Sequence, residues 1–150
     1  MMKSQHDIKT KVSSCCRCID SSTFNNQLVL TKTDHCIISI KIDPDSLDKY
    51  HLELSSIQHN HSIVSCDNDT IEEMDRLKSY IADMFHRELD KSVLFIETAI
   101  HFNHHPHAYI DIIPIERGLE AEASMYFREV LFKYIRIDDD YEVIMRQMMI

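Results

Sequence analysis

The chain has 150 residues, a single glycine and a formal net charge of −9, whereas an average composition would supply roughly 10 glycines. The lone Gly118 excludes glycine-rich phosphate-binding loops, and the acidity disfavours broad binding to a nucleic-acid backbone. Length and composition predict one globular domain with no membrane span and no secretory signal, which places its five cysteines in a reducing compartment.

The first part of the chain is rich in β-forming residues. Three strands are expected there, at Gln27–Lys32, His35–Ile42 and His51–Ile57. A short polar link between the first two predicts a β-hairpin. Downstream, apolar side chains recur at helical spacing over residues 70–88. Asp69 or Thr70 is expected to cap that helix at its N-terminus.

Two more strands and a second helix are expected further along. The strands are Val93–Ile100 and His107–Ile113, the latter closed by Pro114, and the helix covers residues 119–136 after Gly118. The order is therefore β-β-β-α-β-β-α. Because neighbouring strands on short connections pair antiparallel, this order predicts an α+β domain. Its sheet would be five-stranded and mainly antiparallel, with two main helices.

The last predicted strand carries different chemistry on its two faces, because strand side chains alternate. The polar face holds His107, Tyr109 and Asp111. The opposite, apolar face holds Ala108, Ile110 and Ile112 and must face the core. The polar face is either an ordinary solvated sheet face or the floor of a site.

Cysteines near the N-terminus offer a second cluster. Cys15 and Cys18 form a C-x-x-C pair, a spacing at which two thiolates chelate one ion. Tetrahedral zinc then needs two more ligands, commonly histidines. The histidines that the strands would bring near it are His59, His61 and His107. Cys16 with Cys18 is a competing pair, and free, partly buried thiols are the alternative to any metal.

These pieces, taken in order, resemble the first conserved C-terminal domain of the CwfJ-type splicing factors, which has the histidine-triad (HIT-like) fold. The resemblance covers residues 13–137, after a flexible N-terminus at 1–12. It leaves a tail at 138–150, in which a short helix is expected over Tyr141–Met149. The second conserved domain of those factors is expected to be missing. The matching segments are Cys15–Ser22, Gln27–Leu30, His51–His59, Met84-Phe85, Phe95–Thr98, His107–Pro114 and Tyr126-Phe127.

The resemblance implies a structural zinc (Zn2+) site. Cys15 and Cys18 match the family's C-x-x-C pair, and His59 matches the first histidine of its Gln-His-His segment. His107 matches the first histidine of the triad strand, which is a metal ligand in zinc-bearing HIT relatives.

The resemblance also implies that catalysis is lost. Active HIT enzymes use the middle histidine of the triad strand as the nucleophile, and Tyr109 occupies that position here. A phenol is a poor nucleophile at neutral pH, and Asp111 adds negative charge where phosphate would bind. These two are vestigial triad positions. Tyr50 also replaces a glycine usual in the family. In a register shifted by two residues, His105 would bind metal and His107 would be the nucleophile; periodicity permits this shift.

The function implied is that of a non-catalytic, zinc-stabilised module in the nucleus. It would act in late pre-mRNA splicing, in turnover of the intron-lariat complex or in lariat debranching. The implied partners are spliceosomal proteins, among them the lariat debranching enzyme or a disassembly helicase. Branched intron RNA or snRNA within the complex is a further implied contact. No contact with a membrane is implied. A HIT-type nucleotide hydrolase or nucleotidyltransferase that uses His107, and a zinc-bound interaction domain without a splicing role, are the competing hypotheses.

Overall fold

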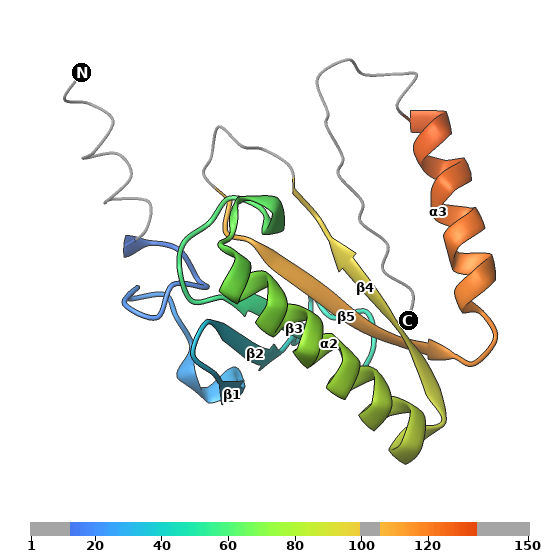
Figure 1. Ribbon diagram of the computed structural model, residues 1–150, viewed down its shortest axis with the longest axis horizontal. Coiled ribbons are helices and arrows are strands. Elements are labelled where there is room, and N and C mark those ends of the chain that lie inside the picture. Colours follow the sequence, from blue (N-terminus) through green and yellow to red (C-terminus); the bar gives the residue numbers. More distant parts are fainter. Residues whose placement is uncertain (1–12, 100–105, 135–150) are drawn as a thin grey trace.

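The computed structural model describes residues 13–99 and 106–134 (Figure 1). The expectations for the N-terminus, for His105 as a metal ligand in the shifted register, for the tail and for the short helix in it fall outside these ranges. In the described part, five strands form one sheet of order β1-β2-β3-β5-β4, and every neighbouring pair is antiparallel. The strands are β1 Val29–Lys32, β2 Cys36–Ile40, β3 Leu52–Ser56, β4 Lys91–Glu97 and β5 Tyr109–Glu116.

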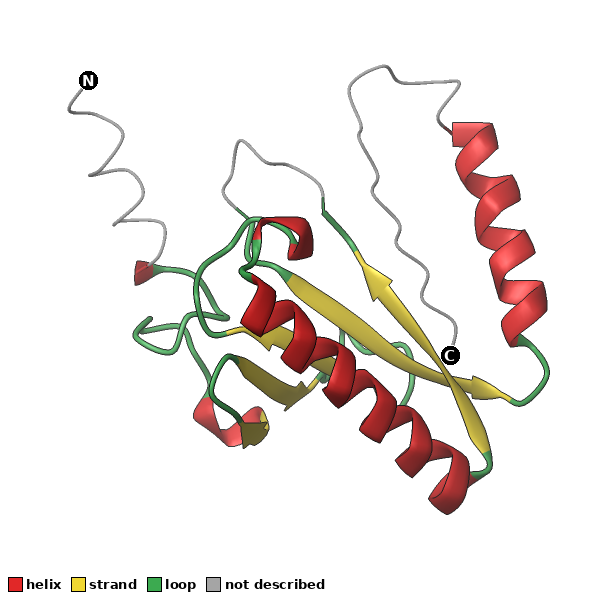
Figure 2. Ribbon diagram, in the orientation of Figure 1, coloured by secondary structure: helices red, strands yellow, loops and turns green. Residues whose placement is uncertain are grey.

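Two long helices accompany the sheet. They are α2 Asn68–Leu89 and α3 Glu120–Tyr134, and single 3-10 turns precede β1 (η1, Asn26–Leu28) and α2 (η2, Ile63–Ser65). Helix α2 lies across one face of the sheet, and α3 lies beside the strand β4 (Figure 2). The predicted α+β class, the β-β-β-α-β-β-α order, the antiparallel sheet and the two main helices are therefore confirmed.

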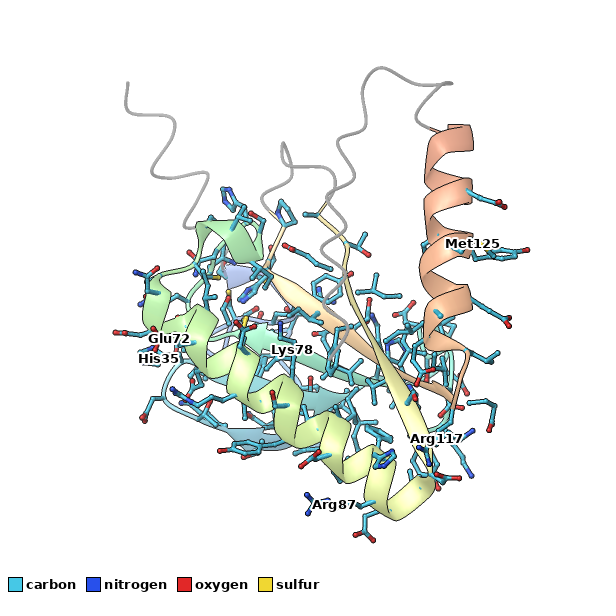
Figure 3. All side chains as sticks on the ribbon, turned by 45° about the vertical axis from the view of Figure 1, so that its right-hand side comes forward. His35, Glu72, Lys78, Arg87, Arg117 and Met125 are labelled. Atoms are coloured by element: carbon cyan, nitrogen blue, oxygen red, sulfur yellow. The ribbon has the colours of Figure 1, made fainter. Side chains whose placement is uncertain are left out.

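The core lies between the sheet and α2. Its buried side chains come from β2, β3, β4, β5 and the inward stripe of α2, and Leu54 and Ile112 at its centre are fully buried. Helix α2 shows its two faces clearly (Figure 3): Lys78 lies on the side toward the sheet, whereas Arg87 projects into solvent. No helix in the described ranges is long and apolar enough to span a bilayer.

The register of β3 against β5 sorts the side chains between the two faces. Leu52 pairs with Ile112 and Leu54 with Ile110, and all four are buried in the core. Their neighbours on β3 point the other way, so that Glu53 stands opposite Asp111 and Ser55 opposite Tyr109. The predicted alternation along β5 is confirmed. The polar face of the sheet also includes Glu53 and Ser55 of β3.

The start of α2 differs from the prediction. Asp67, and neither Asp69 nor Thr70, is the N-cap: its side chain accepts a hydrogen bond from the backbone N–H of Thr70 at 2.8 Å. Asp69 lies inside the first turn, where its charge favours the positive end of the helix dipole. The helix consequently begins two residues before the predicted boundary.

The ends of the last two strands also differ from the prediction. Strand β4 begins at Lys91, two residues before the predicted Val93, and ends at Glu97, before the predicted Ile100. Pro114 was expected to close β5, but the strand continues to Glu116 with Pro114 opposite Val93 of β4. Strand β3 pairs with β5 only as far as Ile112, so that, among the described residues, one side of β5 has no strand partner beyond that point. A proline, which donates no backbone hydrogen bond, is tolerated there. Gly118 then adopts φ +90° and turns the chain into α3.

Candidate metal centre

The C-x-x-C segment forms a tight turn. The backbone N–H of Cys18 donates to the Cys15 carbonyl at 3.3 Å, and that of Ser21 donates to the Cys18 carbonyl at 3.0 Å. The turn directs the Cys15 and Cys18 thiols to one side, and Cys18 is 5% exposed. Cys16, between them, is exposed and lies outside the cluster.

Backbone pairing brings the two histidines together although 48 residues separate them in sequence. The loop after β3 contacts the chain just before β5, because the N–H of Ala108 donates to the Asn60 carbonyl at 2.6 Å. His59 and His107 therefore lie side by side, with ring centroids 4.9 Å apart and an angle of 79° between the planes. His61 packs on the other side of His59 and is not part of the cluster.

The four atoms that these residues offer lie within 4.8 Å of one another. Cys18 Sγ is 3.1 Å from His59 Nδ1 and 3.5 Å from His107 Nδ1, and Cys15 Sγ is 3.4 Å from His107 Nδ1. A tetrahedral zinc ion at ordinary bond lengths would hold a sulfur and a nitrogen about 3.6 Å apart. The predicted set of Cys15, Cys18, His59 and His107 is thus assembled in one place, and its donors fit zinc.

The His107 ring is oriented as a metal ligand requires. Its Nε2 lies 2.8 Å from the Ser56 carbonyl oxygen, so Nε2–H donates there. The lone pair is then left on Nδ1, the nitrogen that faces the two thiols. Burial lowers the pKa of His107 to about 4, which keeps the imidazole neutral, as a ligand must be.

Burial also shifts the pKa of the Cys18 thiol, in the upward direction. Burial, and then the neighbouring Cys15 thiol, raises the pKa of Cys18 to about 12. A buried thiolate is costly unless a cation lies beside it. Cys18 is therefore a neutral thiol at physiological pH in the metal-free protein, and it would lose its proton on binding a metal ion.

A network of ionic contacts lies on the same sheet face, next to the cluster. Arg17 binds Glu53 with two parallel hydrogen bonds, of 2.7 Å from Nε and 2.6 Å from Nη2. Its guanidinium carbon also lies 3.6 Å from the centre of the Tyr109 ring. Lys41 Nζ lies 2.6 Å from Asp111 Oδ1, which is also 3.0 Å from His51 Nε2.

This network changes the interpretation of the two vestigial triad positions. The Asp111 carboxylate does not present unbalanced charge, since it is paired with Lys41. Burial raises the pKa of Tyr109, against the opposing effect of Arg17, so its phenol is neutral at physiological pH. The charged side chains Arg17, Lys41 and Glu53 line a cavity of about 290 Å³ on this face, and they pair with one another or with Asp111.

Sequence reasoning did not identify Arg17, Glu53, Lys41 or His51 as members of this face. One signal was present for Glu53: strand alternation within His51–Ile57 puts it on the face opposite to Leu52 and Leu54. Arg17 lies in a loop without periodicity, and its contact with β3 spans 36 residues. Only the folded chain reveals that contact.

The fold and the site together define a class: small α+β domains with an antiparallel sheet and a Cys2His2 cluster at one end of it. Residues 2–128 match the family described as "Protein similar to CwfJ C-terminal". The chain belongs to this family, and the predicted CwfJ-type domain is confirmed.

Similar proteins include a CWF19-like protein 2 homolog of Caenorhabditis elegans, 25% identical over 130 residues, which are 87% of this chain and 28% of that protein. The pre-mRNA-splicing factor cwf19 of Schizosaccharomyces pombe is 28% identical over 120 residues, which are 80% of this chain and 18% of that protein. The chain thus spans less than a third of either relative. A solved HIT-like protein of Bartonella henselae is similar with a TM-score of 0.49 and 15% identity, over 61% of this chain and 69% of that one.

Proposed function

We propose that this chain is a non-catalytic, zinc-stabilised HIT-like module of a spliceosome-associated factor. Its family and the names of its relatives, CWF19-like protein and pre-mRNA-splicing factor, support the splicing role. The observation that carries the proposal is the joint arrangement of the four donor atoms and the covered Tyr109 ring. The first supports a metal site, and the second argues against catalysis at the triad position.

The metal would be structural. When bound, zinc would cross-link three segments that are distant in sequence: the Cys15–Cys18 turn, the loop at His59 and the approach to β5 at His107. A set of four protein ligands fills tetrahedral zinc and leaves no open position for water or substrate. Catalytic zinc sites keep such a position. The donor count therefore favours stabilisation over chemistry.

Within the described residues, neither candidate position for the triad nucleophile favours catalysis. Tyr109 stands where the family's catalytic histidine would be, and its ring is covered by the Arg17 guanidinium. His107, the nucleophile of the alternative register, has both ring nitrogens engaged: Nε2 by the Ser56 carbonyl and Nδ1 toward the thiols. A nucleophilic imidazole needs one nitrogen free to attack.

A nucleotide hydrolase remains the competing function, and an activity assay separates the two. Purified protein would be incubated with an adenosine phosphoramidate and with a dinucleoside polyphosphate. We expect no turnover above that of a His107→Asn variant. Turnover that is abolished by His107→Asn and retained by Tyr109→Phe would overturn the non-catalytic proposal.

The module would act through its surface, in the nucleus. Its net charge of −9 favours contacts with basic protein segments over contacts with an RNA backbone. Spliceosomal proteins of the late, intron-lariat stage are the proposed partners, with the debranching enzyme or a disassembly helicase among them. Branched intron RNA or snRNA within the same complex is a further proposed contact.

Affinity purification from nuclear extract tests this role. We expect spliceosomal proteins and excised intron lariats to be recovered with the wild-type chain, and to be lost with Cys18→Ser if the metal holds the module together. Recovery of neither would support a zinc-bound interaction domain outside splicing.

A further inference from the structure

Arg17 has an unusual position, because it lies inside the turn that carries both thiols. Its neighbours in sequence are Cys16 and the buried Cys18. Its own side chain leaves the turn, is 21% exposed and reaches across to the sheet. There it forms the two short hydrogen bonds to Glu53 on β3 and stacks on the Tyr109 ring of β5.

The two strands that Arg17 contacts lie next to the histidine ligands in sequence. Glu53 lies on β3, which leads into the loop with His59, and Tyr109 is two residues after His107. The Arg17 guanidinium therefore links the turn that holds the two cysteine ligands to the segments that lead to the two histidine ligands. We name the contacts of Arg17 with Glu53 and Tyr109 the clamp.

Two side-chain hydrogen bonds of this loop connect residues within the loop. Ser21 Oγ donates to the Ser13 carbonyl at 2.9 Å, and Thr23 Oγ1 donates to the Ser14 carbonyl at 3.1 Å. These bonds shape the turn but do not fix its distance from the sheet. The clamp fixes that distance, because a planar guanidinium that forms two hydrogen bonds with one carboxylate has few other orientations.

We propose that Arg17 is a positioning residue for the metal centre: the clamp holds the Cys15–Cys18 turn in register with His59 and His107 before the metal binds. The proposal rests on the zinc site of the proposed function. A preformed site loses less conformational entropy on binding, so the clamp raises metal affinity without touching the metal. By linkage, the metal strengthens the clamp by the same factor.

Zinc affinity is the first measurement, made by competition with a chromophoric chelator. Loss of a group that orients metal ligands weakens binding about 10- to 100-fold, and we expect Arg17→Met to fall in that range. Arg17→Lys should recover little of this loss, because an ammonium cannot form the two-bond contact. Arg87→Met is the control, since Arg87 is 72% exposed on α2 and pairs with Asp83 of its own helix.

The route through Glu53 is tested by a double-mutant cycle. If Arg17 acts by gripping Glu53, the losses of affinity from Arg17→Met and Glu53→Gln do not add in the double variant. Additive losses would contradict the clamp. Circular dichroism confirms that each variant is folded before its affinity is compared.

A spectroscopic measurement on the wild-type chain serves if a variant fails to fold. Because a hydrogen bond to a carboxylate moves an N–H resonance downfield, the Arg17 Hε resonance should already lie downfield in the zinc-free protein, where Nε–H donates to Glu53. A wild type that binds zinc while Arg17→Met binds equally tightly, or whose Hε in the zinc-free protein lies at the position of a solvent-exposed arginine, overturns the inference and leaves the zinc site intact. A folded wild type that binds no zinc overturns the proposed function and the inference with it.

Discussion

Loss of the metal should lower the stability of the folded chain by a measurable amount. The four ligands connect a turn at residues 15–18 with positions 59 and 107, so the metal binds the folded arrangement and has no comparable site in the unfolded chain. Free zinc at 100 times its dissociation constant stabilises such a fold by about 2.7 kcal/mol. For a domain of this size, 1 kcal/mol corresponds to about 4 °C in melting temperature. Chelation should therefore lower the melting temperature by about 10 °C.

The assay is thermal unfolding followed by circular dichroism, with and without a strong chelator. Cys18→Ser should reproduce the chelated melting temperature and should not respond to zinc, because a serine hydroxyl is not a thiolate ligand. Cys16→Ser is the matched control: it is the same substitution two residues away, at an exposed thiol outside the cluster. Equal melting temperatures with and without chelator, or equal losses for the two serine variants, would refute the reasoning.

Three further predictions concern the core, the helix cap and the thiols. Ile112→Ala, at a fully buried position, should lower the free energy of unfolding in urea by about 2–5 kcal/mol. Leu119→Ala, at a 43% exposed position, should change that free energy little. Equal losses for the two variants would contradict the placement of the core. Asp67→Ala should lower the melting temperature more than Asp69→Ala, because only Asp67 caps α2; the reverse order would favour the cap expected from sequence. Zinc binding at pH 7 should release the Cys18 proton, since the pKa of that thiol is about 12 without metal. The affinity for zinc should therefore fall as the pH falls. Calorimetry in two buffers of different ionisation enthalpy measures the proton release, and its absence would contradict this prediction.

The sheet could be predicted because its signals are local. Alternation along residues 107–113 separated the core side chains from the polar ones, and the register observed between β3 and β5 agrees with it. The approach of Cys15, Cys18, His59 and His107 was predicted by a different route, through resemblance to a family. Spacing alone left His61 and Cys16 as open alternatives.

The helix cap and the clamp could not be predicted, for different physical reasons. Asp67, Asp69 and Thr70 all have capping side chains within four residues, and only the backbone geometry, extended at Asp67, selects among them. The contact between Arg17 and Glu53 joins a loop to a strand 36 residues away. No periodic pattern encodes such a contact, because it depends on how the loop folds back over the sheet.

The central claim is that four side chains of this chain hold one structural zinc ion. X-ray absorption at the zinc edge, on protein purified without added metal, measures this directly. The account predicts one zinc per chain with two sulfur neighbours at about 2.3 Å and two nitrogen neighbours at about 2.0 Å. Folded protein without stoichiometric zinc, or zinc with an oxygen of solvent in place of one of the four ligands, would contradict it.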